Sequence, residues 1–227
     1  MNDMKIDDEG PALRERLLRL DSCALSDALD SLSLPPAVIG LSPLSVATRI
    51  AGPVSTVKLG PDKPPGDSPR HLGTAAVENA SPGDIVAIEH SSGVACAGWG
   101  GVLSAGARLN GIAGVIIDGP ARDIDEAREL GFPIYGLSAV ARTARGRVYE
   151  QDFDCPITIG GVIVHAGDWA LADSSGVVFI PRHRLKAVLA RAERIAERER
   201  LMIEALRAGD RITDVLGRDY EEMLSKL

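Results

Sequence analysis

The chain has 227 residues, enough for one domain with a substantial core, and its 45% hydrophobic and 25% charged content is ordinary for a globular protein. A formal net charge of −7 and few aromatic residues argue against a nucleic-acid-binding surface. No apolar run is long enough to span a membrane, and three widely spaced cysteines are typical of free thiols in the cytoplasm.

The first third of the chain predicts two helices, a strand and a loop. Leucines at helical spacing predict a helix over residues 11–20, and Ser26 is placed to cap a short helix over 26–32. Alternating apolar residues predict a strand at 54–59. Residues 60–70 hold four prolines and two glycines, so we expect a loop there, the best candidate for a mobile flap.

The middle of the chain predicts helices and strands in alternation. The helices are expected at 72–80, 102–109 and 123–130, and the strands at 85–89, 115–117 and 132–135. This order is typical of a largely parallel sheet whose strands are joined by helical crossovers.

After residue 146 the pattern changes to short apolar runs separated by glycine- and serine-rich turns. These predict two hairpins, one from 157–159 and 162–164 and the other from 169–172 and 177–180. The sheet is therefore expected to be mixed.

A long helix is predicted over residues 184–208, with apolar residues in a seven-residue repeat. Glu199 occupies a position of this repeat where an apolar residue is expected. A carboxylate on an apolar stripe must be paired, face a polar site or lie at the edge of the stripe. Either Glu199 belongs to a site, or the stripe ends there and the side chain reaches solvent.

Arg122 and Asp123 follow the strand predicted at 115–117 and the turn residues Asp-Gly-Pro. Strand ends in α/β folds are where ligands bind. A guanidinium suits a carboxylate or phosphate, and a carboxylate beside it can hold a hard divalent cation. The glycine-rich loop 98–101 precedes a helix whose first amides would face an anion. The alternative interpretation is a surface ion pair behind a turn.

Several motifs, in one order along nearly the whole chain, resemble the RraA-like family. They include Gly-Val-Ile-Ile-Asp-Gly-Pro-Ala-Arg-Asp at 114–123 and Gly-Gly-Val-Ile-Val-His-Ala-Gly-Asp at 160–168. The resemblance implies a single-domain α/β sandwich with a swivelling-type mixed β core and a long C-terminal helix. It implies a homotrimer or a dimer of trimers, with the segment 184–227 packed on a neighbouring subunit.

The family includes class II aldolases that cleave 4-hydroxy-4-methyl-2-oxoglutarate and decarboxylate oxaloacetate. The resemblance implies that Asp123 binds Mg²⁺ or Mn²⁺ and that Arg122 holds the carboxylate of a small α-keto acid. Glu199 of a neighbouring subunit would hold one of the waters on the metal. The remaining substrate-binding positions implied are Gly101 and the backbone amides of Val102, Leu103 and Ser104.

One position departs from the pattern of the aldolases, which carry an acidic residue where this chain has Gly101. That carboxylate serves as an acid or base in the reaction. This chain therefore keeps the residues expected to bind metal and substrate but lacks one that catalysis uses. Glu89 and His90, at the end of a strand, are candidates to replace it. The sequence therefore predicts a metal-dependent lyase. The alternative is a catalytically impaired relative that binds a protein, as the ribonuclease E inhibitors of this family do.

Overall fold

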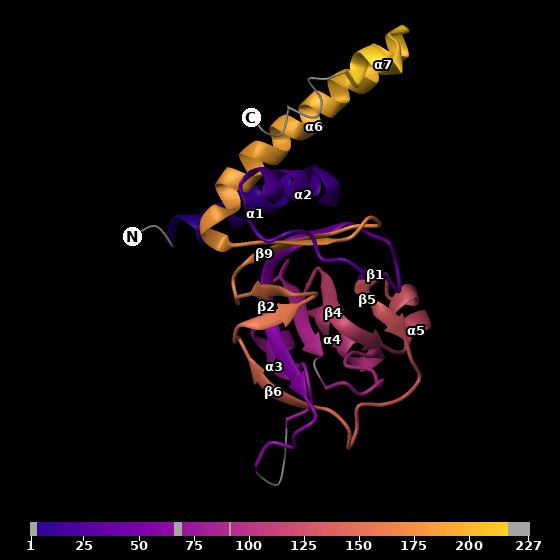
Figure 1. Ribbon diagram of the computed structural model, residues 1–227. Helices are drawn as coiled ribbons and strands as arrows, with labels where there is room; N and C mark the ends of the chain where they lie inside the picture. The colour runs from indigo at the N-terminus through magenta and orange to yellow at the C-terminus, as the bar shows by residue number, and fades with distance from the viewer. Residues whose placement is uncertain (1–3, 66–69, 91, 218–227) are drawn as a thin grey trace.

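A mixed β-sheet lies at the centre of the molecule (Figure 1). The structure, a computed structural model, describes residues 4–65, 70–90 and 92–217, with side chains from residue 9 onward. The strand order is β1-β5-β4-β3-β2-β9-β10, and β6 pairs with the far end of β2. The strands of this sheet are β1 (Ser42–Pro43), β2 (Ile50–Gly60), β3 (Ile85–His90), β4 (Gly114–Ala121), β5 (Ile134–Ala139), β6 (Tyr149–Phe153), β9 (Trp169–Ala172) and β10 (Val177–Ile180).

Four neighbouring strands, β2 to β5, run parallel, as the alternation of helices and strands predicted. The crossovers that join them contain α3 (Thr74–Asn79), α4 (Gly101–Leu109) and α5 (Ile124–Glu129). The core beneath these helices includes Trp99 and Phe132, both buried, whose rings stack with their centroids 6.2 Å apart. Because the strands are parallel, their carboxyl ends meet at one edge of the sheet.

A second layer of helices covers the β9–β10 part of the sheet (Figure 1). Four apolar residues of the predicted heptad stripe on the long helix are buried in this layer, which confirms that part of the periodicity. The helices are α1 (Met4–Leu18), α2 (Ser22–Ser31) and, after a 3₁₀ turn at Arg182–Arg184, α6 (Leu185–Ala208).

Both predicted hairpins are present. The first consists of β7 (Ile157–Ile159) and β8 (Val162–Val164), and Gly160 and Gly161 in its turn both have positive φ, as a tight hairpin requires. The second consists of β9 and β10. The chain is thus a mixed α/β single domain with a long C-terminal helix, as expected from its sequence.

Two local predictions are corrected. The helix predicted to be capped by Ser26 begins earlier, because the Asp21 side chain caps it by accepting a hydrogen bond from the amide of Ala24 at 2.8 Å. The strand β4 continues through the expected Asp-Gly-Pro turn to Ala121, because it pairs with β5 beyond an irregularity in register. The strand β6 was not predicted. Of the predicted flap, residues 66–69 lie outside the described residues.

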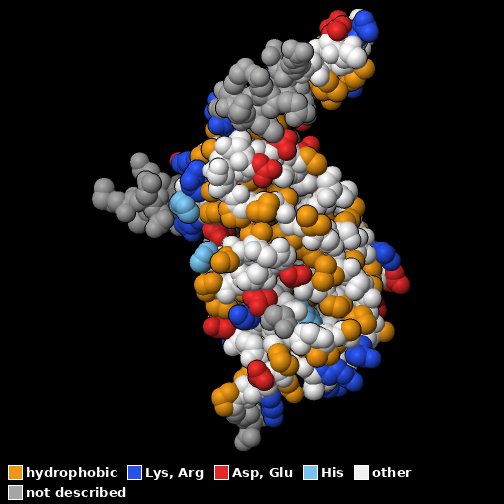
Figure 2. Space-filling model, viewed as in Figure 1, with side chains coloured by type: hydrophobic (Ala, Val, Ile, Leu, Met, Phe, Trp, Pro, Cys, Tyr) orange, Lys and Arg blue, Asp and Glu red, His pale blue; other side chains and the backbone are white. Residues whose placement is uncertain are grey.

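The second half of α6 extends away from the sheet and ends near α7 (Ile212–Val215) (Figure 1). Apolar side chains are exposed along this end (Figure 2), including Leu201, which is 51% exposed, and Ile203. Among the described helices, none is both long and apolar enough to cross a membrane. The packing of residues 184–227 on a neighbouring subunit stays a prediction, and residues 218–227 lie outside the described residues.

Candidate functional site

The glycine-rich loop before α4 lies beside the end of β4. The Gly98 amide donates to the carbonyl of Pro120 at 2.9 Å, and the Arg122 amide donates to the carbonyl of Trp99 at 3.0 Å. These two bonds act as a short extension of the parallel sheet, with Trp99 opposite Ala121. They bring together two segments about twenty residues apart that the sequence placed at the same sheet edge.

Asp123 has a left-handed backbone, with φ 56° and ψ 45°, and stands at the start of α5. An Asp in this place usually caps its own helix, but the Asp123 carboxylate makes no such bond. Instead its Oδ2 accepts a hydrogen bond from the Gly101 amide of α4 at 2.9 Å. Arg122 Nε lies 3.2 Å from each carboxylate oxygen. The chain therefore turns this carboxylate away from its own helix and toward the neighbouring one.

The first turn of α4 contributes backbone amides to the site. The amides of Val102 and Leu103 belong to the first helical turn, where no helix carbonyl is in reach, so they remain candidates for an anion. The Ser104 amide does not, because it donates to the Gly100 carbonyl at 3.0 Å. The Ser104 hydroxyl is fully buried and accepts a hydrogen bond from the indole of Trp99 at 2.9 Å. The expected anion-binding role of Ser104 is corrected to the support of this aromatic residue.

A cavity of about 370 Å³ opens at this edge of the sheet. Gly101, Val102, Leu103, Arg122 and Asp123 all line it, so the structure brings these predicted residues together, while the buried Ser104 stays outside its lining. Its other walls come from residues 70–72, 97, 100, 143–146 and 148–150. The volume is within the range of small-molecule sites.

A larger cavity of about 650 Å³ lies against Arg14 and the turn Pro82–Asp84, at the opposite, amino ends of the parallel strands. Ligands in open α/β sheets bind at the carboxyl ends of the strands. We therefore place the candidate site in the cavity that holds Arg122 and Asp123.

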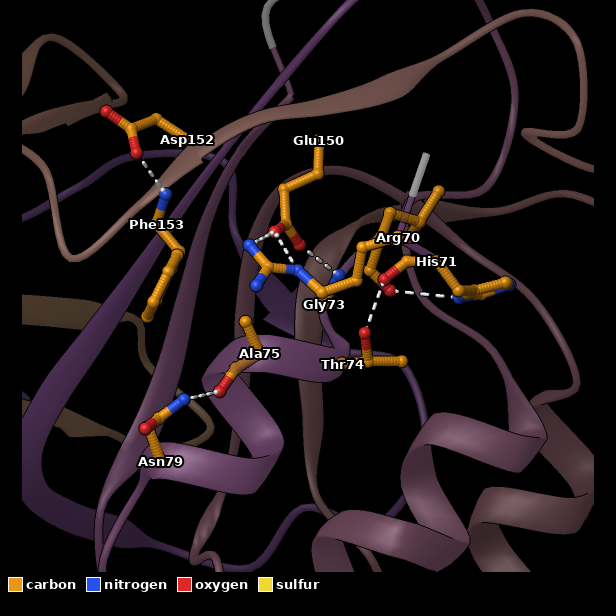
Figure 3. A network of polar contacts seen from close by, with 10 residues as sticks. Arg70, His71, Gly73, Thr74, Ala75, Asn79, Glu150, Asp152 and Phe153 are labelled. Atoms are coloured by element: carbon orange, nitrogen blue, oxygen red, sulfur yellow. Dashed lines mark hydrogen bonds and ion pairs between the residues drawn. The ribbon is translucent and has the colours of Figure 1, made fainter. Parts of the chain in front are cut away.

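A second charged pair, Arg70 with Glu150, lines this cavity and was not predicted from the sequence. Arg70 Nη2 and Nε lie 2.8 and 3.2 Å from Glu150 Oε1, and the Gly73 amide donates to Glu150 Oε2 at 2.7 Å (Figure 3). The Arg70 guanidinium also lies over the Phe153 ring, 4.9 Å from its centroid. No local sequence signal marked the pair, because β6, which contains Glu150 and Phe153, is a mostly polar stretch and was not predicted.

Glu199 is not part of this cavity within one protomer. It lies on α6, which packs against α2, and it does not line the cavity. Burial, and then the nearby carboxylates of Asp21 and Asp27, raise the pKa of Glu199. The buried part of the α6 stripe ends at Ile195, and Glu199 beyond it is partly exposed in this protomer. Its expected role, at the site of a neighbouring subunit, stays a prediction.

The two residues considered as replacements for a carboxylate at position 101 have other partners. Glu89 accepts a hydrogen bond from the Thr158 amide at 2.7 Å and lies 3.6 Å from the Lys58 ammonium. The His90 ring lies 2.9 Å from the Cys96 carbonyl. Neither residue lines the cavity, so both serve the packing of the strand ends and the β7–β8 hairpin.

A divalent cation would find one accessible carboxylate here, Asp123, because the oxygens of Glu150 are bound by Arg70 and the Gly73 amide. Among the described residues there is no group of three or more His, Cys, Asp or Glu side chains that could hold a metal. Mg²⁺ is nevertheless commonly held by one or two carboxylates, with water and substrate oxygens as its other ligands. The Asp123 side chain is 31% exposed in the cavity, and the adjoining Gly101 has no side chain to occupy the space. This arrangement fits such a cation.

Comparisons with known proteins point in one direction. A family model, RraA-like: Aldolase/RraA, matches residues 22–179. A Halalkalibacterium halodurans protein with the provisional name 4-hydroxy-4-methyl-2-oxoglutarate aldolase is 32% identical over 77% of this chain and 79% of its own length. The Legionella pneumophila protein DlpA is 28% identical over 89% of this chain.

This chain spans only 33% of the length of DlpA. Among solved structures, an uncharacterized protein from Pseudomonas syringae pv. tomato superimposes with a TM-score of 0.81 and is 28% identical. That likeness covers 90% of this chain and 92% of the other.

Proposed function

Because this chain belongs to the RraA-like family, we propose that it is a divalent-metal-dependent lyase that cleaves a C–C bond in a small 2-oxo acid. The reactions would be retro-aldol cleavage of a 4-hydroxy-2-oxo acid, such as 4-hydroxy-4-methyl-2-oxoglutarate, and decarboxylation of oxaloacetate. The observation that supports this most is the Asp123 carboxylate, which is turned from its own helix into a cavity beside Arg122 and the first turn of α4.

Arg122 would bind the substrate carboxylate next to the 2-oxo group. Its Nε pairs with Asp123, while its two Nη atoms make no hydrogen bond to any described residue. A guanidinium with free Nη atoms can bind a carboxylate through charge-assisted hydrogen bonds. The amides of Val102 and Leu103 line the same cavity and would add neutral donors. These groups together would fix the orientation of the substrate.

Asp123 would hold Mg²⁺ or Mn²⁺ with water and substrate oxygens. When bound, the cation supplies electrophilic stabilisation of the negative charge that develops on the 2-oxo oxygen as the C–C bond breaks. The Gly101 amide and Arg122 Nε orient the Asp123 carboxylate by hydrogen bonding to it. Retro-aldol cleavage and decarboxylation of a β-keto acid both leave the same pyruvate enolate, so one site would serve both.

The second candidate, a protein-binding regulator without catalysis, would need neither a cation nor an anion site. Arg122 and Asp123 are only partly exposed, at 38% and 31%, and they line a cavity that suits a small molecule. The regulator is therefore the outcome that remains if the catalytic test fails.

The proposal is tested by pyruvate release from oxaloacetate with Mg²⁺ or Mn²⁺, measured against the spontaneous rate. Turnover should disappear with EDTA and should fall at least about 100-fold in Asp123→Asn. Asn is chosen because it tolerates the left-handed backbone at this position. Asp125→Asn is the matched control, since Asp125 lies two residues away and its side chain is 88% exposed. Equal metal binding and turnover in Asp123→Asn and the parent would overturn the assignment.

A further inference from the structure

The pair Arg70–Glu150 gives the cavity a second anion-binding group. We propose that Arg70 is a specificity-determining residue that binds a second carboxylate of the substrate, and that Glu150 is the residue that positions it. This inference rests on the proposed function for its substrate, and it concerns the part of the cavity that would receive the distal carboxylate. It would make the site selective for 2-oxo acids with a carboxylate at each end.

The Arg70–Glu150 pair joins an exposed arginine to a buried carboxylate. Glu150 is almost completely buried, with 5% of its side chain exposed, whereas 52% of the Arg70 side chain is exposed and lines the cavity. The Nε and Nη2 atoms of Arg70 both bind Glu150 Oε1, and the second oxygen of Glu150 is taken by the Gly73 amide. Glu150 is thus held firmly, and it holds one edge of the guanidinium.

The pairing with Glu150 leaves one donor of the Arg70 guanidinium free. Arg70 Nη1 makes no hydrogen bond to any of the described residues, and Arg70 is one of the residues that line the cavity. The Phe153 ring beneath the guanidinium further restricts its movement. An arginine in a cavity wall that is fixed on one edge and one face and keeps a free donor is pre-organised to bind an anion.

The cavity is lined by more arginines than carboxylates. Three arginines line it, Arg70, Arg122 and Arg145, against the carboxylates of Asp123 and Glu150. A divalent cation at Asp123 would add further positive charge. The cavity therefore favours a ligand with more than one negative charge. Arg122, after β4, and Arg70, after β2, both line this cavity, and the proposal assigns one carboxylate of the ligand to each.

The experiment compares two 2-oxo acids that differ in the distal carboxylate, by calorimetric titration with Mg²⁺ present. The parent protein should bind 2-oxoglutarate at least about 10-fold more tightly than 2-oxobutanoate, because loss of a charge-assisted hydrogen bond typically costs about one order of magnitude or more in affinity. Arg70→Ala should abolish that preference, because it should weaken the binding of 2-oxoglutarate and leave the binding of 2-oxobutanoate unchanged. Arg70→Lys should restore part of it. Arg108→Ala, an exposed arginine of α4 outside the cavity, is the matched control.

Arg70→Ala leaves the buried Glu150 without its partner, which is destabilising. The double variant Arg70→Ala with Glu150→Gln removes that stranded charge and should show the same loss of preference. Glu150→Gln alone keeps an acceptor for the Gly73 amide but loosens Arg70. It should weaken the binding of 2-oxoglutarate about 3- to 10-fold with little change in the binding of 2-oxobutanoate, a split that a general loss of structure would not produce.

The outcomes separate this inference from the proposed function. If the parent releases pyruvate from oxaloacetate but Arg70→Ala keeps the same preference for the dicarboxylate, the role of Arg70 is wrong and the lyase proposal stands. If the parent shows no turnover but its preference for 2-oxoglutarate depends on Arg70, the inference stands as a binding property. A parent with no preference between the two acids overturns the inference.

Discussion

The Asp123 carboxylate accepts a hydrogen bond from the Gly101 amide at 2.9 Å, and a Cβ atom on Gly101 would lie 3.4 Å from the same oxygen. Any side chain at position 101 would therefore start beside Asp123. Gly101 does not have a positive φ, so a side chain there is compatible with the backbone. The acidic residue that the aldolases carry at this place would thus face the proposed cation site.

Gly101→Asp is expected to raise the turnover of oxaloacetate, because it adds a carboxylate that can act as acid or base beside Asp123. General acid–base catalysis contributes about 10²–10⁴-fold in rate, and we expect the lower end here. The Cβ atom would lie only 3.1 Å from Asp123 Cβ, so the neighbouring side chain must shift slightly. The measurement is kcat with Mg²⁺ for the parent and the variant.

Gly101→Asn is the matched control, since it adds the same bulk without an acid. It should leave kcat at or below that of the parent. An equal gain in the Asp and Asn variants would mean that the bulk of the added side chain, and not proton transfer, causes the increase in kcat.

A mixture of two inactive variants is expected to recover activity if Glu199 completes the site of another subunit. In one protomer Glu199 lies on α6 near Asp21 and Asp27, away from the cavity. When Asp123→Asn and Glu199→Gln chains are co-expressed in equal amounts, about one quarter of the sites should pair an intact Asp123 with an intact Glu199, as in any closed oligomer with one donor per site. Pyruvate release by the mixed oligomer is the readout.

Glu199→Gln should not harm folding, because it removes a charge that burial and two neighbouring carboxylates disfavour. A loss of activity in the Glu199→Gln variant would therefore indicate a role of Glu199 in the site and not a folding defect. Absence of recovery in a mixed oligomer that forms normally would rule out a role for Glu199 across subunits.

Asp173 is expected to make stability depend on pH. Burial raises the pKa of this carboxyl, but hydrogen bonds from the Ser22 amide and hydroxyl and from the Ser175 amide outweigh it, so the pKa is lowered overall. A lowered folded-state pKa contributes stability above the unfolded value of about 4, and that contribution is lost as the pH falls through the folded value.

Asp173→Asn should therefore cost about 1–3 kcal/mol at pH 7, and the cost should shrink below about pH 4. Urea unfolding of parent and variant at pH 7 and pH 3.5 measures this difference. The exposed Asp210→Asn serves as control and should change stability by less than about 0.5 kcal/mol. A cost for Asp173→Asn that stays constant down to pH 3.5 would show that the charge is not what stabilises the contact.

Local signals predicted much of the fold. Gly160 and Gly161 marked a hairpin because only that turn needs two residues with positive φ in succession. The buried strand before Asp118 was equally clear. Its end was not, because the pairing of Pro120 with Ser138 depends on a strand that comes later in the chain. Tertiary pairing overrode the local turn signal.

The candidate site was predicted only in part, for a related reason. Arg122 and Asp123 stand together in the sequence, so their proximity needed no knowledge of the fold. Arg70 and Glu150 are 80 residues apart, and their contact exists because β6 pairs antiparallel with the far end of β2. Tyr149–Phe153 is a mostly polar stretch without strand periodicity, so nothing local marked it. A pair held only by such a long-range contact cannot be found from residue patterns.

The left-handed backbone at Asp123 restricts which residues that position can hold. Glycine, asparagine and aspartate adopt this conformation readily, whereas other residues are strained by about 1–2 kcal/mol. Asparagine would preserve the turn from β4 into α5 while removing the negative charge. Exchange of one carboxylate oxygen for an NH₂ group would therefore keep the backbone of this turn and remove the proposed metal ligand, so a descendant of this chain could lose the proposed reaction and keep the fold.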